Sequence, residues 1–140
     1  MKFLICFLFL YFSQFAQAQN GILIINVANV KHRAGNVKAI IQNRSNFLTP
    51  QYVACIEVIP TTNDVQMVFK DLPIGEYSVA IYHDMNANNL FDRNWIGYPK
   101  EPFAVSNNLR PYKLLYPSFD AAKITLTDKG SSVAIHLLNN

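Results

Sequence analysis

The sequence has little cysteine and little charge, and these shortages exclude several classes of protein. Its only cysteines are Cys6 and Cys55. Cys6 lies in the apolar leader described below, so the mature chain keeps one thiol and cannot form an internal disulfide. Charged residues make up 15% of the chain, and lysine and arginine form no run. We therefore expect neither a nucleic-acid-binding surface nor binding to an anionic membrane.

Signatures of catalysis are also missing. The chain contains no Gly-x-Ser-x-Gly elbow, no His-Glu-x-x-His pair and no glycine-rich phosphate loop. A triad of Ser106, His83 and Asp120 would have to be assembled by folding, and the sequence shows no activation geometry. Cys55, in the strand-like segment YVACIEVI, is either a nucleophile or a small packing residue, and its apolar setting favours packing. The sequence predicts a protein that is not an enzyme.

A strongly apolar run opens the chain. Met1 and Lys2 give a positive start, residues 3–12 (FLICFLFLYF) are apolar throughout, and Ala16–Ala18 form a small-x-small cleavage signature. A membrane span needs about 20 apolar residues, so a retained anchor, the alternative, is disfavoured. We expect residues 1–18 to be a signal peptide and residues 19–140 to be one mature domain, periplasmic or secreted, without a membrane span.

Apolar and polar residues alternate along most of the mature chain. Residues 21–30 begin as a continuous apolar run, as expected of a strand buried on both faces. The period of two that is typical of half-buried strands occurs in six further segments: 36–42, 52–59, 65–70, 76–82, 123–126 and 132–137. Seven such segments without a helical stripe predict an all-β domain, a single seven-stranded β-sandwich of immunoglobulin-like or prealbumin-like type.

Two short segments rich in turn residues connect neighbouring strands. Asp71–Gly75 places Pro73 where a type I turn favours it, with glycine two residues later. Asp128–Ser131 has a similar composition near the C-terminus. Because each joins two alternating segments, each is interpreted as a β-hairpin.

Residues 83–122 have neither a strand nor a helix period, and they predict one long irregular loop. A connection of this length is uncommon in a compact domain unless its own contacts or a ligand order it. The aromatic residues in this segment argue against disorder. We therefore expect the loop to be held in place.

The start of this loop has oxygen-bearing residues at alternating positions, in the order of the ligands of an EF-hand-type calcium loop. Asn89 stands where that loop has glycine and Trp95 where it has a bidentate glutamate, so the segment is not an EF-hand. The hypothesis is that Ca²⁺ orders residues 83–122, and the alternative is an Asx-rich turn that satisfies its own backbone. The candidate ligands are the side chains of Asp84, Asn86, Asn88 and Asp92 and the carbonyl of Leu90.

Other residues of the loop are candidates for ligand binding. Histidine can anchor a loop, bind a metal or act as a base. Aromatic rings can stack on a sugar or form a small core of the loop, and the Lys-Glu pair is either a site or an ion pair. The candidates are His83, Trp95, Tyr98, Lys100, Glu101, Ser106 and Asn107.

Several motifs resemble those of one bacterial family. Residues 83–108 contain His-Asp-x-Asn-x-Asn-x-x-x-Asp, Gly-x-Pro-Lys-Glu and Ser-Asn-Asn, and residues 117–122 contain Pro-x-Phe-x-x-Ala. These motifs, with the Phe-x-x-Leu-Pro-x-Gly-x-Tyr segment from residue 69, resemble the domain of unknown function 2141 family over essentially the whole mature chain. Asn89 and Ala104 stand where its members usually carry glycine. The resemblance implies an exported β-sandwich protein and no established activity.

Two functions remain open. The first is an exported binding or interaction module for another protein, with its long loop ordered by calcium. The second is binding of a glycan or a small polar molecule through the aromatic residues of the loop. Free rings of Trp95 and Tyr98 lining a pocket would favour the second function, and rings packed against the sandwich would favour the first.

Overall fold

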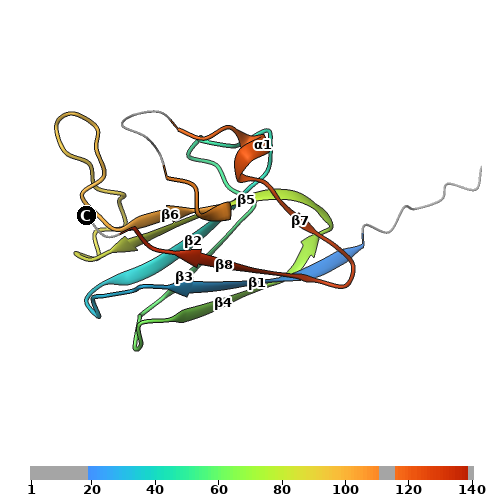
Figure 1. Ribbon diagram of the computed structural model, residues 1–140, viewed down its shortest axis with the longest axis horizontal. Helices are drawn as coiled ribbons and strands as arrows, with labels where there is room; N and C mark the ends of the chain where they lie inside the picture. The colour runs from blue at the N-terminus through green and yellow to red at the C-terminus, as the bar shows by residue number, and fades with distance from the viewer. Residues whose placement is uncertain (1–18, 111–115, 139–140) are drawn as a thin grey trace, which may run out of the picture.

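The computed structural model describes residues 19–110 and 116–138, which form two β-sheets with almost no helix (Figure 1). This architecture confirms the all-β prediction, whereas the expected signal peptide, residues 1–18, lies outside the described residues. The helical elements are a 3-10 turn, η1 (Ser106–Asn108), and α1 (Phe119–Ala122). The strands are β1 (Asn20–Ala28), β2 (Asn36–Gln42), β3 (Ala54–Val58), β4 (Val65–Pro73), β5 (Gly75–Asp84), β6 (Phe103–Val105), β7 (Ile124–Leu126) and β8 (Ser131–His136).

The first sheet brings the two ends of the domain together. Its order is β4-β1-β8, with β1 antiparallel to β4 and parallel to β8. Leu23, Ile25 and Val27 alternate along β1 and are at most 1% exposed. Ile22, which directly precedes Leu23, is 47% exposed. The prediction that this strand is buried on both faces is therefore wrong. The apolar run of β1 covers one buried face and one partly exposed face.

The second sheet is antiparallel and has the order β3-β2-β5-β6, with β7 pairing the first residues of β5. Alternate residues of β2 and β5 face the first sheet and form the core with β1, β4, β7 and β8. Burial of each large aliphatic side chain in such a core contributes about 1.5–3 kcal/mol to stability. The residues between them on the outer face include Ile40, Gln42, Ala80 and Tyr82.

The two segments interpreted as hairpins cross between the sheets, so that interpretation is wrong. β4 pairs with β1 in the first sheet and β5 pairs with β2 in the second sheet, so Asp71–Gly75 carries the chain from one sheet to the other. Near this crossover the pairing of β1 with β4 shifts register, and Asp71 has a positive φ of 58°. Asp128–Ser131 likewise leads from β7, on β5, to β8, on β1. A turn sequence shows that the chain reverses, but it does not show which strand becomes the neighbour.

The segment expected to be one irregular loop, residues 83–122, contains regular elements. β6 pairs with Ala80–Tyr82 of β5, and the four-residue helix α1 follows the gap in the described residues. The described part of the chain therefore has eight strands, one more than expected. β6 has three residues, too few to show a period of two.

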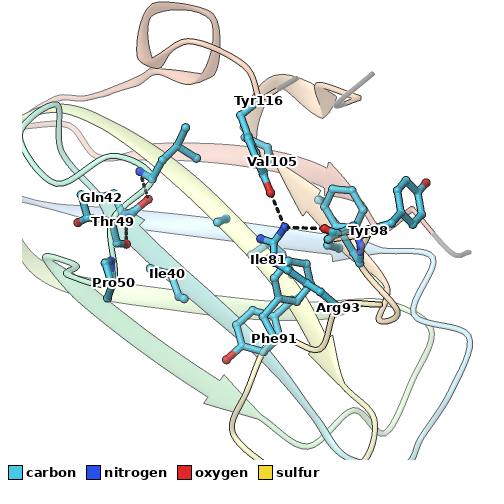
Figure 2. Close-up of a pocket in the computed structure, with 17 residues that line it drawn as sticks. Ile40, Gln42, Thr49, Pro50, Ile81, Phe91, Arg93, Tyr98, Val105 and Tyr116 are labelled. Carbon is cyan, nitrogen blue, oxygen red and sulfur yellow. Dashed lines mark hydrogen bonds between the residues drawn. The ribbon is translucent and has the colours of Figure 1, made fainter. Parts of the chain in front are cut away.

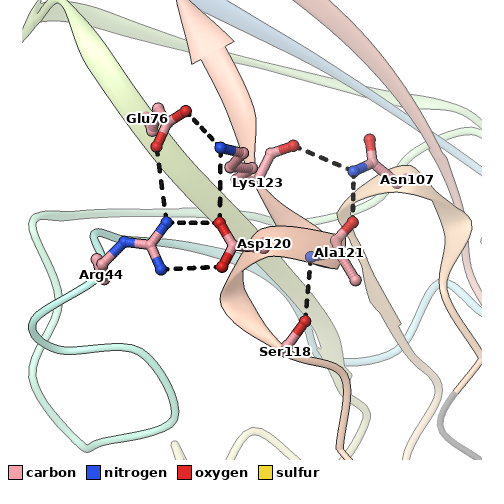
Figure 3. Close-up of polar contacts among 7 residues, drawn as sticks. All are labelled: Arg44, Glu76, Asn107, Ser118, Asp120, Ala121 and Lys123. Carbon is pink, nitrogen blue, oxygen red and sulfur yellow. Dashed lines mark hydrogen bonds and ion pairs between the residues drawn. The ribbon is translucent and has the colours of Figure 1, made fainter.

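An ion-pair network holds α1 against the second sheet (Figure 3). Arg44 donates to both carboxylate oxygens of Asp120, at 2.6 and 3.1 Å. Lys123 lies 2.7 Å from Glu76 of β5 and 3.5 Å from Asp120. The Arg44 guanidinium also lies 4.6 Å from the Phe119 ring centre. The network joins α1 to β5 and to the segment after β2.

Among the described residues, no helix is both long enough and apolar enough to cross a lipid bilayer.

Candidate functional site

The candidate calcium loop begins at the last residue of β5, where its first carboxylate is buried. Asp84 has none of its surface exposed. Its Oδ1 accepts the N–H of Asn88 at 3.1 Å, and its Oδ2 accepts the N–H of Asn89 at 2.7 Å. Ala87 and Asn89 have positive φ, at 55° and 64°. The Asp84 side chain thus satisfies the backbone of a tight turn, as Asx side chains do.

The other side chains predicted as ligands join the same hydrogen-bonded cluster. The Nδ2 atoms of Asn86 and Asn88 donate to Asp92 Oδ2 at 2.8 and 3.0 Å. Their Oδ1 atoms accept the N–H groups of Asn88 and Leu90, at 3.1 and 2.8 Å. Among the described residues, no group of three or more His, Cys, Asp or Glu has the arrangement of a metal site. The side chains of this loop therefore form hydrogen bonds within the loop itself.

Glu101 closes this cluster from the far side of the loop. It is 3% exposed, and its two oxygens accept the N–H groups of Met85 and Asp92 at 3.1 and 3.2 Å. Burial raises the pKa of Glu101, these two hydrogen bonds lower it, and the charges of Asp84 and Asp92 raise it, with a net increase. Because folding raises the pKa of this carboxyl, its contribution to stability is present below the unfolded-state pKa and is lost as the pH rises toward the folded-state pKa.

His83 is buried and contacts the segment before β2. Its Nε2 lies 2.7 Å from the carbonyl oxygen of Ala34, which fixes Nε2 as the donor. Its Nδ1 is buried without a hydrogen-bond partner among the described side chains. This contact ties the end of β5 to the chain that enters β2.

Ser106 and Asn107 hold α1 rather than lining a cavity. The Ser106 hydroxyl accepts the N–H of Val79 at 3.1 Å and donates to the carbonyl of Ala122. The Asn107 amide donates to the carbonyls of Ala121 and Lys123, at 2.8 and 3.1 Å (Figure 3). Both side chains thus join the η1 turn to the segment that carries α1.

A pocket of about 480 Å³ lies on the outer face of β2, β5 and β6 (Figure 2). Its base is formed by outward-facing residues of these strands, and its walls come from residues 48–50 and 91–99 and from Tyr116. The volume lies within the range of about 300–1,000 Å³ that is typical of small-molecule sites. Most of the lining is apolar or aromatic: Ile40, Leu48, Pro50, Ala80, Phe91, Tyr98, Phe103, Val105 and Tyr116.

Gln42 shapes one wall of the pocket. It is 7% exposed, and its Nε2 donates to the carbonyls of Asn46, Thr49 and Gln51, each at 2.9 Å. Its Oε1 accepts the N–H of Leu48 at 3.3 Å. One buried amide therefore fixes the loop after β2, so the protein's own hydrogen bonds hold this wall of the pocket.

Arg93 is the charged residue of the opposite wall. Its Nη1 donates to the carbonyl of Gly97 at 3.1 Å and to the Tyr116 hydroxyl. The guanidinium carbon lies 4.9 Å from the ring centre of Phe91 and 5.6 Å from that of Tyr116. Figure 2 shows the guanidinium between these two residues. The position combines a fixed positive charge with aromatic surfaces.

The aromatic candidates of the loop have separate positions. Asn94 N–H donates to the Tyr98 carbonyl at 2.8 Å, and the Asn94 side chain accepts from Ile96 and Tyr98, which makes a tight turn. Trp95 stands on this turn, 95% exposed and outside the pocket lining. Tyr98 lines the pocket and is 41% exposed. Lys100 is exposed beside the same turn.

Cys55 lies on β3, opposite Ile40 of the pocket base, and is partly exposed. Burial raises the pKa of the Cys55 thiol, and the nearby charge of Lys38 lowers it by less. The thiol is therefore protonated at neutral pH, unlike the thiolate of a reactive cysteine.

Most residues of the pocket, including Gln42 and Arg93, were not predicted from the sequence. Gln42 falls on the polar face of an alternating strand, where glutamine is ordinary. Arg93 carried a usable signal, because it is a single cation between aromatic residues in a segment without a regular period.

Comparison with known proteins identifies the family. No curated protein and no solved structure shows a significant match to the chain. Residues 25–134 match the family described as "Uncharacterized protein conserved in bacteria (DUF2141)". This match spans strands of both sheets, the candidate calcium loop and most of β8. The chain therefore belongs to the DUF2141 family of uncharacterised bacterial proteins.

Proposed function

We propose that the protein is an exported, non-enzymatic binding module of the immunoglobulin-like or prealbumin-like sandwich type, and that it binds a small molecule in the pocket on β2, β5 and β6. The pocket itself carries this proposal, because it has the size of a ligand site and a wall fixed by Gln42. The described residues of its lining include no His, Cys, Asp or Glu, the types that most often act as nucleophile or base. Tyr98 lines the pocket and is 41% exposed. Its position favours ligand binding over the alternative that the aromatic residues of the loop serve only to pack the loop.

The apolar lining favours a ligand that is largely apolar over a glycan. Sugar binding needs many hydrogen-bonding groups, whereas the amide of Gln42 is already committed to the loop after β2. Trp95, one of the two rings expected to stack on a sugar, lies outside the pocket.

A neutral apolar fluorophore tests the pocket. N-phenyl-1-naphthylamine should bind wild-type protein with brighter, blue-shifted emission, because the lining excludes water from the dye. Ala80→Trp, at the base of the pocket, should abolish this signal by filling the space. Ala134→Trp, the same substitution on an exposed position of β8, should leave it unchanged. Equal dye binding by both variants, or no binding by wild type, would contradict the proposal.

A second proposal concerns the loop that forms the far wall. We infer that Ca²⁺ binds the cluster of Asp84, Asn86, Asn88, the Leu90 carbonyl and Asp92, and orders the segment from His83 onward. The observation in its favour is electrostatic. Asp84, Asp92 and Glu101 lie close enough for the first two to raise the pKa of the third, and within residues 19–110 and 116–138 none of them has an ion-pair partner. A cation would offset this repulsion, with Asn86 and Asn88 turning their amide oxygens inward.

Thermal unfolding with and without calcium tests the ion. At ten times the dissociation constant, Ca²⁺ should add about 1.4 kcal/mol to the free energy of unfolding, a rise in Tm of several degrees. Mg²⁺ should add less because it requires smaller, octahedral geometry. Asp84→Ala should lose the calcium response, and Asp128→Ala, at an exposed turn, should keep it. Identical melting of wild type in calcium and in chelator would leave the Asx turn as the whole explanation.

A further inference from the structure

We propose that the ligand of the pocket has an apolar or aromatic body and one acidic group, and that Arg93 binds the acidic group. This inference rests on the proposed function, since it assumes that the pocket is the binding site. It adds the charge and the chemical class of the ligand.

The charges of the pocket are unbalanced. Among the described residues that line it, Arg93 is the one charged residue, and none is an aspartate or a glutamate. The rest of the lining is apolar, aromatic or amide and hydroxyl in character. Arg93 is exposed and reached by water, but the aromatic surfaces of Phe91 and Tyr116 beside it strengthen its interaction with an anion relative to open solution.

Arg93 also lacks the partner that similar cations of this protein have. Arg44 too lies over an aromatic ring, and it pairs with Asp120 at 2.6 Å. Lys38 pairs with Glu57 at 3.1 Å. Among the described residues, Arg93 forms no ion pair, and it donates hydrogen bonds only to a carbonyl and a hydroxyl. A guanidinium has five N–H donors, so the contacts through Nη1 leave donors for a ligand.

Two polar side chains of the pocket, Gln42 and Thr49, are committed to the protein. The Gln42 amide binds three carbonyls of the loop after β2. The Thr49 hydroxyl donates to the Asn46 carbonyl at 2.7 Å and accepts from Gln51 N–H at 3.2 Å. An acidic group that enters the pocket therefore meets Arg93 as its charged donor, and the aromatic side chains of the lining are available to the apolar part of the ligand.

Two ligands of the same shape and different charge test this inference. At neutral pH, 2-naphthoate is an anion, and 2-naphthamide is its neutral counterpart. Each is used to displace N-phenyl-1-naphthylamine from the protein. We expect 2-naphthoate to compete about tenfold better with wild type, because a charged hydrogen bond adds affinity of that order.

Substitutions then assign the preference to one residue. Arg93→Gln should make the two competitors equal while the dye still binds, and Arg93→Lys should keep part of the preference because it retains the charge but loses the planar fork. Lys70→Gln, which removes the same charge from an exposed position on β4, should behave as wild type.

The outcomes separate the two proposals. If wild type binds the dye but does not distinguish the competitors, or if Arg93→Gln keeps the full preference, the assignment to Arg93 is overturned while the pocket stands. If wild type does not bind the dye at all, the pocket fails as a ligand site and this inference fails with it.

Discussion

Gly35→Ala is expected to lower the free energy of unfolding by about 3–5 kcal/mol, the sum of left-handed backbone strain and a steric clash. Gly35 has a φ of +73°. A Cβ atom at this position would lie 1.9 Å from the carbonyl oxygen of Asp84 and 2.7 Å from the Cα of Met85. Both are backbone atoms, so no side-chain rotation relieves the contact. The end of β5 would have to move away from β2.

Urea unfolding of two further variants isolates the cause. Gly130→Ala tests left-handed strain with less crowding, since its φ is +81° and the nearest atom, the Ile22 carbonyl oxygen, is 3.0 Å away. Gly75→Ala is the control for crowding: its φ of +159° is also unfavourable for alanine, but nothing lies closer than 4.0 Å. We expect the loss of stability to be largest for Gly35→Ala and smallest for Gly75→Ala. Equal losses at Gly35 and Gly75 would refute the steric argument.

Asp84→Ala is expected to lower the free energy of unfolding by about 2–4 kcal/mol, because it removes the acceptor of two backbone N–H groups at a buried position. The amides of Asn88 and Asn89 would lose their hydrogen-bond acceptor. Where these amides exchange through local opening of the loop, the free energy of opening should fall by the same amount and hydrogen exchange should be faster. Measurement in chelator separates this structural effect from any contribution of calcium.

Asp92→Ala is the matched control within the same loop. Its carboxylate is bonded by the side-chain amides of Asn86 and Asn88, which can turn to water when the acceptor is lost. We expect a loss below about 1 kcal/mol, in line with the small net value of exposed hydrogen bonds. A larger loss for Asp92→Ala than for Asp84→Ala would show that the cluster, and not the buried Asp84 carboxylate, holds the loop.

The strands were predictable from the sequence because alternation is a local property. The segment 36–42 matches β2, and the segments at residues 65 and 76 lie within β4 and β5. Sheet membership is not local. β1 binds β4 on one edge and β8 on the other, so the turns after β4 and β7 had to cross the sandwich, although their residues are those of hairpins.

The candidate site divides in the same way. The hydrogen-bonded cluster of the candidate calcium loop is formed mainly within residues 84–92, so the spacing of its side chains was visible in the sequence. The pocket combines β2, β5, β6, two loops and Tyr116. Its residues share no spacing, and Gln42 on the outer face of β2 has the same pattern as a solvated strand residue. Only the tertiary arrangement distinguishes the two cases.

The parallel pairing of β1 with β8 has a consequence for the order of folding. Asn26 bonds to Ser132, 106 residues away along the chain. Contacts this distant in sequence slow folding, because a long loop must close before they form. During synthesis, one edge of β1 stays unpaired until β8 has formed, and such edges recruit other chains. The whole of β8 therefore protects β1 against aggregation, and a truncation before Ser131 would remove this protection.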